Sequence, residues 1–273
     1  MALRGRSRDR LVTATAQRTA QILEALRGLD EEALLSPSEL PGWSRLTIAC
    51  HLRYGAEALC RMTDAALSGE PAAYYPEGRD RQRPGTLVPR PGESNQAVVA
   101  SLAQRSEQLT RFWSSEEVPW DLEVVEPPGQ DDLGTVDLGR LLLLRLTEVE
   151  VHGLDLGLDL PDWSTLFVRE ALPMRLAWLN TRRTNHRAFD ANLEGSWLLV
   201  VTDGPDRPAY EVSVIGNKVT SRSASPDCSA RAVIAASCRD LLALLLGRPF
   251  AESPQCSGDT AFGEAFAAAF PGP

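Results

Sequence analysis

The spacing of apolar residues changes once along the chain, near residue 160, and this change most constrains what the chain can fold into. Before it, apolar residues recur three and four positions apart, which is the period of amphipathic α-helices. After it, Tyr210, Val212 and Val214 alternate with polar or small residues, as in a half-buried strand. The chain has 273 residues, more than the ~150 of an average domain. The sequence therefore predicts an α+β protein, with a helical bundle over residues 1–160 and a small α+β domain over residues 161–273.

Four helices are predicted for the first domain. Their expected ranges are Arg8 to Gly28, Ser44 to Leu67, Ser94 to Trp113 and Thr135 to Asp159. Ser44 and Thr135 are expected N-caps, because their side-chain oxygens can accept hydrogen bonds from backbone N–H groups of the first turn. Helices joined by loops of this length indicate a four-helix bundle, a fold in which metal sites are built from side chains on facing helices.

The second domain is predicted to begin with a helix from Ser164 to about Arg183 and to continue with strands. The expected strands are Ser196 to Thr202, Tyr210 to Val214, a strand from Lys218 after the hairpin signal Gly216-Asn217, and the stretch A-R-A-V-I-A-A. Ser237 and Asp240 form an S-x-x-D capping box for a helix that ends at Gly247. A last helix is expected from Asp259 to Phe270.

The helix expected from Thr135 to Asp159 carries a polar stripe beside its apolar face. Arg145, Glu148, His152 and Asp155 follow one another at helical spacing, and Glu148 lies one turn from His152. A carboxylate and an imidazole that border an apolar stripe cost free energy unless a partner satisfies them, and a metal ion would be such a partner. The E-x-x-x-H pair alone is more often an ordinary surface pair, so further ligands have to be sought elsewhere in the chain.

The chain offers three histidines for such a site, His51, His152 and His186. His51 lies two turns into the second helix on a largely apolar face, whereas His186 lies in an arginine-rich stretch and is predicted to be a surface loop residue. His51, Glu148 and His152 would supply two histidines and a carboxylate, a usual ligand set for a catalytic divalent metal that keeps positions open for water or substrate. Asp155 would either orient an imidazole or be a surface aspartate at the helix end. Spacing alone does not show whether the two helices face each other.

Charge and composition exclude several classes of protein. The net charge of −9 argues against a general nucleic-acid binder, which needs a basic footprint. No apolar run approaches the ~18 residues of a transmembrane helix, and no apolar core follows the basic N-terminus as in a signal peptide. The five cysteines form no C-x-x-C motif and are interpreted as reduced thiols. The sequence therefore predicts a cytoplasmic protein that binds neither membranes nor nucleic acids, and it leaves the oligomeric state open.

The predicted loop from Gly69 to Gly92 is rich in arginine. Arg79, Arg81, Arg83 and Arg90 lie in it. The loop is either a solvated surface segment or an anion-facing segment over a site, since guanidinium groups suit carboxylates.

Two segments of the chain resemble a known family. The segment L-P-G-W-S-R-L-T-I-A-C-H-L, which contains His51, is followed in the fourth predicted helix by R-L-T-E-V-E-V-H-G-L-D-L-G. Together they resemble the mycothiol-dependent maleylpyruvate isomerase family, within the DinB-like bundle superfamily. The resemblance implies a DinB-like four-helix bundle and a small α+β domain, whose L-L-x-L-L-x-G-R end is matched at Leu241 to Arg248.

The same resemblance implies a metal site and a thiol cosubstrate. His51, Glu148 and His152 match the family's metal-ligand positions, for Zn²⁺ or a similar divalent ion, and the thiol is mycothiol. The chain departs from the family at Gly153, where members often carry a second histidine. A loop segment of the family is matched by Tyr75, Pro76, Arg79 and Asp80, but extra arginines and prolines surround it.

The function that the resemblance implies is a metal-dependent enzyme that activates a low-molecular-weight thiol for addition to a small electrophilic substrate. Reversible addition to a conjugated double bond gives cis–trans isomerisation, whereas capture of the electrophile gives S-transfer, and the sequence does not choose between them. Maleylpyruvate is a dianion, and Arg79 and Arg248 are the candidates to bind it. Arg248 is at least as well explained as a cation at a helix C-terminus.

Two other functions stay open. One is a non-catalytic thiol- or metal-binding module, or a partner-binding module, although three ligands near apolar faces argue for an active site. The other is a metal-dependent hydrolase, which would need a general-base carboxylate beside the metal-bound water; Glu150 is on the wrong face of its helix for that role. Trp43 and Trp197 are predicted to pack and not to serve as substrate platforms, with Trp43 placed to staple the entry of the second helix.

Overall fold

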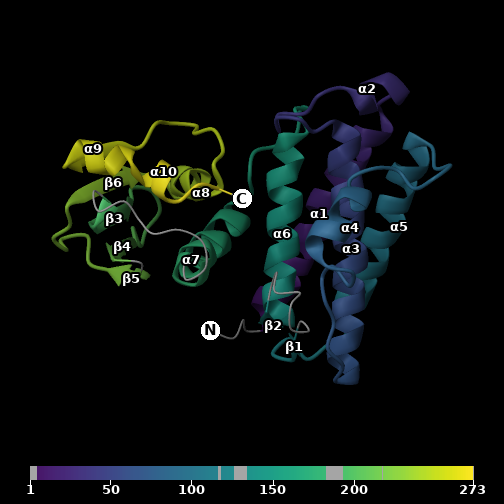
Figure 1. The fold of residues 1–273 in the computed structure, drawn as a ribbon, viewed down its shortest axis with the longest axis horizontal. Coiled ribbons are helices and arrows are strands. Elements are labelled where there is room, and N and C mark those ends of the chain that lie inside the picture. Colours follow the sequence, from purple (N-terminus) through teal and green to yellow (C-terminus); the bar gives the residue numbers. More distant parts are fainter. Residues whose placement is uncertain (1–4, 116–117, 126–133, 183–192, 217, 273) are drawn as a thin grey trace. The chain divides into compact units, whose positions relative to one another are not determined.

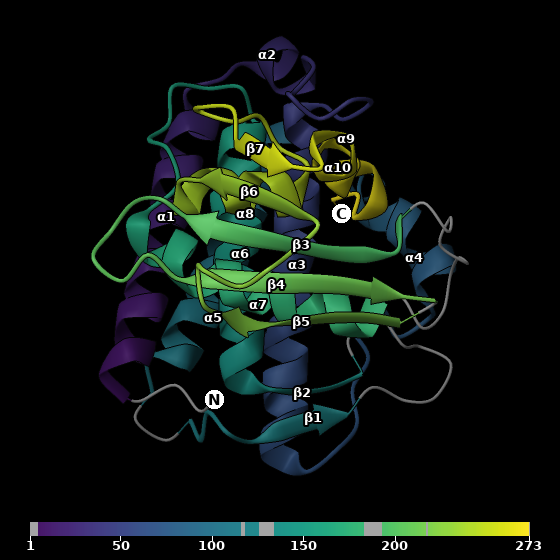
Figure 2. The ribbon, with the colours of Figure 1, turned by 90° about the vertical axis from the view of Figure 1, so that its left-hand side faces the viewer.

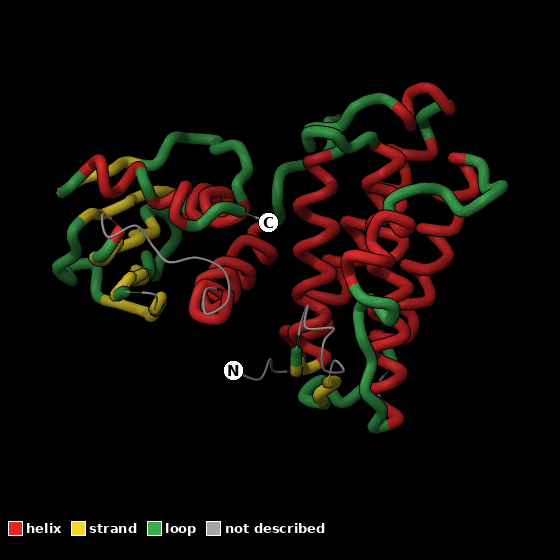
Figure 3. Tube along the Cα trace, viewed as in Figure 1, coloured by secondary structure: helices red, strands yellow, loops and turns green. Residues whose placement is uncertain are grey.

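The computed structural model describes residues 5–115, 118–125, 134–182, 193–216 and 218–272, and it divides into two compact units, Met1–Phe167 and Val168–Pro273. The first unit is helical apart from a short hairpin, and the second contains a larger sheet (Figure 3). The predicted α+β class, with a helical bundle followed by a sheet-containing domain, is confirmed. Among the described residues, none of the helices combines the length and apolar character that crossing a bilayer requires.

Four long helices dominate the first unit: α1 (Gly5–Arg27), α3 (Arg45–Ser68), α5 (Asn95–Trp113) and α6 (Leu138–Asp155). They run side by side in Figure 1, and each contributes a fully buried apolar residue, Leu26, Ile48, Leu102 and Leu146 in turn. The predicted cap of α3 is also found, because the Ser44 side chain accepts a hydrogen bond from the backbone N–H of Thr47 at 3.1 Å. The apolar spacing in the sequence therefore located all four bundle helices.

Short elements of the first unit were not expected from the sequence. They are α2 (Glu31–Leu35), α4 (Arg79–Thr86), β1 (Glu123–Val125) and β2 (Thr135–Asp137), which pairs with β1 in antiparallel fashion. The predicted cap at Thr135 is wrong, because Thr135 begins β2. Asp137 caps α6 instead, its carboxylate accepting a hydrogen bond from the backbone N–H of Arg140 at 2.7 Å. The helix ends at Asp155, earlier than predicted, since Gly157 has a φ of 63° that helical backbone does not adopt.

The second unit contains a five-stranded sheet of order β5-β4-β3-β6-β7 (Figure 2). Its strands are β3 (Gly195–Val201), β4 (Ala209–Ile215), β5 (Lys218–Ala224), β6 (Ala232–Ala236) and β7 (Gln255–Gly258). The β3–β6 pair is parallel and the other pairs are antiparallel. Trp197 of β3 is fully buried, stacks on Phe262 with ring centroids 4.0 Å apart, and donates its indole N–H to the Phe262 carbonyl. It packs as predicted.

The helices of the second unit are α7 (Thr165–Arg182, whose first residues belong to the first unit), α8 (Cys238–Leu246), α9 (Thr260–Glu264) and α10 (Phe266–Ala269). Ser237 caps α8 through the backbone N–H of Asp240, and Gly247 ends it in a left-handed conformation, both as predicted. The single last helix that was expected is instead divided at Ala265 into α9 and α10. Strand β7 was not expected, because its four residues, Q-C-S-G, carry no apolar alternation.

Candidate metal centre

Helices α3 and α6 bring together the three side chains that the sequence proposed as ligands. One ligand atom from each of His51, Glu148 and His152 lies within 4.8 Å of the other two. His51 Nε2 lies 2.6 Å from Glu148 Oε2, and His152 Nε2 lies 3.4 Å from the same oxygen. Two imidazole nitrogens and a carboxylate oxygen therefore converge on one point of the bundle, from positions that are far apart in the sequence.

The electrostatics of this cluster depend on burial and on the shared carboxylate. Burial would raise the pKa of Glu148, but His51 and His152 hold it well below its usual value. Burial also opposes a charge on His152, but hydrogen bonds to Asp155 and Glu148 prevail and raise its pKa to about 9. The pKa of His51 is lowered by burial, which the Glu148 carboxylate only partly offsets. The shared Glu148 carboxylate thus favours the charged form of His152, whereas burial dominates at His51.

Asp155 fixes the orientation of His152. Its Oδ2 lies 2.9 Å from His152 Nδ1, and the residue is 3% exposed. A proton shared at Nδ1 leaves Nε2 turned toward Glu148, which is the arrangement by which outer carboxylates hold metal-ligating histidines. Of the two interpretations that the sequence left open for Asp155, the structure shows the contact with an imidazole.

Trp43 closes one side of the cluster. Its ring stands edge-on to His51, with centroids 5.5 Å apart, and stacks on His152 at 6.0 Å with an interplanar angle of 15°. The Ser38 hydroxyl donates to the Trp43 carbonyl at 2.8 Å, and the Glu39 backbone N–H donates to the Asp155 carbonyl at 2.8 Å. Trp43 packs, as predicted, but it packs against two candidate ligands. The sequence feature that predicted this packing is the position of Trp43 directly before Ser44, the N-cap of the helix that bears His51.

Arg83 lies nearer to the cluster than the loop composition suggested. It belongs to α4, and its guanidinium carbon lies 5.6 Å from the centroid of the Trp43 ring. Its positive charge adds to the effects that lower the pKa of His51, after burial as the main cause. Arg79, the arginine proposed from the sequence, begins the same helix and is exposed.

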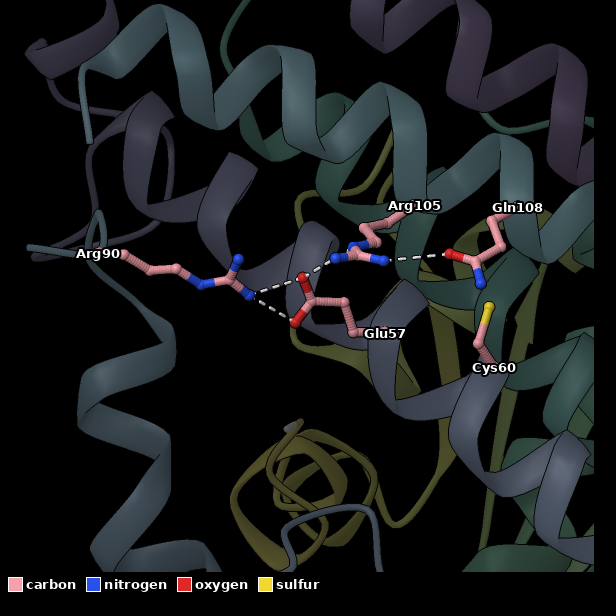
Figure 4. Close-up of a pocket in the computed structure, with 5 residues that line it drawn as sticks. All are labelled: Glu57, Cys60, Arg90, Arg105 and Gln108. Carbon is pink, nitrogen blue, oxygen red and sulfur yellow. Dashed lines mark hydrogen bonds and ion pairs between the residues drawn. The ribbon is translucent and has the colours of Figure 1, made fainter. Parts of the chain in front are cut away.

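Arg90 and Arg105 line another pocket of the helical unit, together with Glu57 (Figure 4). Arg90 and Arg105 close on the Glu57 carboxylate at 2.7 Å and 3.2 Å. Cys60 lies in the same pocket, and burial raises the pKa of its thiol to about 11. Glu57 therefore neutralises both arginines, and the raised pKa keeps the Cys60 thiol protonated at neutral pH. This pocket adds no ligand to the His51–Glu148–His152 cluster.

A buried cation lies one turn before Glu148 on α6. Arg145 is 1% exposed and donates to the Leu52 carbonyl at 2.8 Å and to Ser106 Oγ at 3.1 Å. A Cβ on Gly55 of α3 would meet the Tyr74 hydroxyl at 3.0 Å and Arg145 Nη1 at 3.3 Å. The missing side chain at Gly55 therefore makes room for a guanidinium and a hydroxyl beside the cluster. The sequence placed Arg145 on the polar stripe but carried no sign of its burial.

The opposite face of α6 is held by a buried ion pair between Arg18 and Glu150. Arg18 Nε lies 3.3 Å from Glu150 Oε2, and Arg18 Nη1 donates to the Pro161 carbonyl at 2.7 Å. The Ser164 hydroxyl also hydrogen-bonds to Glu150. A Cβ on Gly153 would come within 2.8 Å of Arg18 Nε, so Arg18 fills the space in which a side chain at this position would begin. Glu150 therefore faces away from the cluster, as the sequence predicted.

Two further residues of the sequence analysis lie elsewhere. Arg248 belongs to the second unit, where its Nη1 donates to the Leu246 carbonyl at 3.0 Å at the C-terminal end of α8. This contact is the helix-capping alternative that the sequence left open for it. His186 lies outside the described residues.

Comparison with known proteins identifies the family. The family model for the mycothiol maleylpyruvate isomerase N-terminal domain matches residues 15–157. The chain is similar to the crystal structure of the mycothiol-dependent maleylpyruvate isomerase, with a TM-score of 0.66, 22% sequence identity and 92% of each chain covered. A histidine-to-alanine mutant of mycothiol-dependent maleylpyruvate isomerase matches with a TM-score of 0.65 and 21% identity, again over 92% of each chain. At these identities the solved structures show a shared fold, and no curated protein matches the chain. Because the family model covers more than half of its residues, the chain belongs to the mycothiol maleylpyruvate isomerase family.

Proposed function

We propose that the chain is a metal-dependent enzyme that activates a low-molecular-weight thiol, mycothiol, for addition to a small electrophilic substrate. The observation that carries the proposal is the convergence of His51, Glu148 and His152, with ligand atoms within 4.8 Å of one another. Two imidazoles and one carboxylate suit a divalent ion such as Zn²⁺ and leave coordination positions open. The buried His51 Nδ1 has no hydrogen-bond partner among the described residues, so that nitrogen can keep the proton while Nε2 presents its lone pair to an ion.

A divalent ion held there would act as a Lewis acid that lowers the pKa of a thiol, so that a thiolate forms near neutral pH. The residues of the chain supply the setting for this chemistry. Asp155 holds His152 Nδ1 and thereby the ring orientation, and the Trp43 ring lies against both imidazoles. The fully buried Arg145 places a fixed positive charge near Glu148.

The thiolate attacks an electrophilic carbon, and an S–C bond forms as the electron pair of the double bond moves to the neighbouring carbon. If that pair returns and the thiolate leaves after rotation, the net result is cis–trans isomerisation, in which the thiol is regenerated. If a proton is instead taken up at the carbon, a thioether remains, which is S-transfer. Membership of the family favours isomerisation, and S-transfer is the alternative outcome of the same first step.

The test is metal content and thiol response of the purified protein. We expect about one zinc per chain in the wild type, a thermal shift with mycothiol, and loss of both in His152→Ala and Glu148→Gln. Glu107→Gln is the matched control, because Glu107 is an exposed α5 carboxylate that pairs with Arg111. The wild type should then isomerise maleylpyruvate in the presence of mycothiol. A protein without metal that does not respond to mycothiol would refute the enzyme and leave the non-catalytic binding module.

A further inference from the structure

Arg83 differs from Arg81 and Arg90 in having no counter-ion among the residues that the structure describes. Arg81 pairs with Glu77 at 3.5 Å, and Arg90 pairs with Glu57 at 2.7 Å. The Arg83 guanidinium makes neither a hydrogen bond nor an ion pair with any residue that the structure describes, although its side chain is partly buried. Because none of the described residues accepts a hydrogen bond from this guanidinium, its N–H groups can donate to an anion from outside the chain.

The position of Arg83 ties that anion to the metal centre. The guanidinium lies 5.6 Å from the Trp43 ring centroid, and Trp43 contacts both His51 and His152. An aromatic ring attracts a guanidinium and restricts its motion, while the N–H groups at the edge of the guanidinium remain able to donate.

The segment that carries Arg83 is fixed to α3 on both sides of α4. Before α4, Tyr75 stacks on Tyr54 with centroids 5.2 Å apart, and Arg61 Nη2 donates to the Tyr74 carbonyl at 2.9 Å. After α4, Glu93 accepts two hydrogen bonds from Arg53 Nη1, at 2.8 Å and 2.7 Å. Because α3 also carries His51, these contacts hold Arg83 in a defined place relative to the cluster.

We propose that Arg83, held by Trp43, binds a carboxylate of the electrophilic substrate and so determines the specificity of the site for small carboxylic acids. The proposal rests on the proposed function for the identity of the reaction. The guanidinium fork matches a carboxylate with two parallel N–H···O bonds, which an ammonium group does not reproduce. Arg83 thus selects the substrate by its charge, and the metal-binding side chains are not needed for that selection.

The experiment measures binding of succinate, an unreactive dicarboxylate, to the purified protein by calorimetry without any thiol. We expect Arg83→Gln to weaken succinate binding about tenfold or more, and Arg83→Lys to recover part of the loss. Arg81→Gln is the matched control, since Arg81 lies on the same helix, is exposed, and pairs with Glu77; it should bind succinate within about twofold of wild type. Zinc content and the thermal shift with mycothiol should be equal in all four proteins.

A second measurement separates charge recognition from damage to the fold. Turnover of dimethyl maleate, which has no free carboxylate, should be the same in wild type and Arg83→Gln, whereas KM for maleylpyruvate should rise in the variant alone. The inference would be overturned if wild type did not bind succinate, if Arg83→Gln bound it as wild type does, or if Arg81→Gln lost it equally. Failure of the proposed function has a different signature, in which zinc or mycothiol is not bound while the succinate comparison still reports on Arg83.

Discussion

Replacement of Asp155 tests the metal centre without touching a proposed ligand. Asp155 accepts from His152 Nδ1 at 2.9 Å and is almost completely buried. In Asp155→Asn the side chain keeps its shape and an acceptor oxygen but loses its negative charge. In Asp155→Ala the acceptor is lost as well, and a buried N–H of the imidazole is left without its partner.

The expected magnitudes follow from what each variant removes. Loss of an outer partner of a metal-ligating histidine lowers metal affinity by about 10- to 100-fold. Asparagine retains the hydrogen bond, so we expect a loss of about tenfold in zinc affinity, which corresponds to about 1.4 kcal/mol. Alanine removes both charge and hydrogen bond, so we expect about 100-fold, or about 2.8 kcal/mol.

The assay is competition for zinc with a chromophoric chelator, with circular dichroism to show that each variant is folded. Asp159→Asn is the control, because Asp159 is an exposed carboxylate just beyond the end of α6. It should bind zinc as wild type does. Equal zinc affinities for wild type, Asp159→Asn and Asp155→Ala would refute the reasoning, because the contact with His152 would then have no influence on the site.

Three further outcomes are expected. Burial opposes a charge on His152, but its hydrogen bonds to Asp155 and Glu148 raise its pKa to about 9, so zinc must displace a proton from this imidazole. In the same competition assay, zinc affinity should therefore rise about tenfold per pH unit from about pH 7 and level off above pH 9. Gly153→His should displace Arg18 from Glu150 and lower the free energy of unfolding in urea by about 1–3 kcal/mol. The control is Gly85→Ala, because a Cβ at Gly85 meets no atom within 4 Å; it should change the free energy of unfolding by less than about 0.5 kcal/mol. Burial would raise the pKa of Asp240, but hydrogen bonds from Ala251, Ser237 and Glu252 lower it below its usual value. The ionised carboxylate therefore stabilises the fold above the pKa of the unfolded state, and this stabilisation is lost as the pH falls. Urea unfolding of Asp240→Asn should accordingly show a weaker loss of stability in acid than that of the wild type.

Local signals in the sequence account for much of the fold. Ser44 and Ser237 were identified as N-caps from their own side-chain chemistry, and the bundle helices were located because their apolar periods extend over several turns. The strands β3, β4 and β5 follow from apolar runs, alternation and a turn signal within single segments. Each of these features depends on residues that are neighbours in the chain.

Features that depend on contacts between distant segments could not be predicted in this way. Strand β2 has three residues and exists through its pairing with β1, which is why Thr135 was misassigned as a helix cap. The meeting of His51 with Glu148 needed the family resemblance, since spacing does not report which helix faces are opposed. The contact of Trp43 with both imidazoles, the contact of Arg83 with the Trp43 ring and the burial of Arg145 are tertiary properties, and no local pattern encodes them.

The two faces of α6 are held by separate sets of contacts. One face carries Glu148 and His152, and the other is fixed through Glu150 by the buried Arg18. The helix that bears two of the three proposed ligands is therefore anchored by contacts that do not involve an ion. Exchange of one metal for another would then proceed in the folded protein, at a rate set by breaking of ligand bonds and not by unfolding. If an ion binds at the proposed site, its identity would accordingly follow the metal supply of its surroundings and would not be fixed when the chain folds.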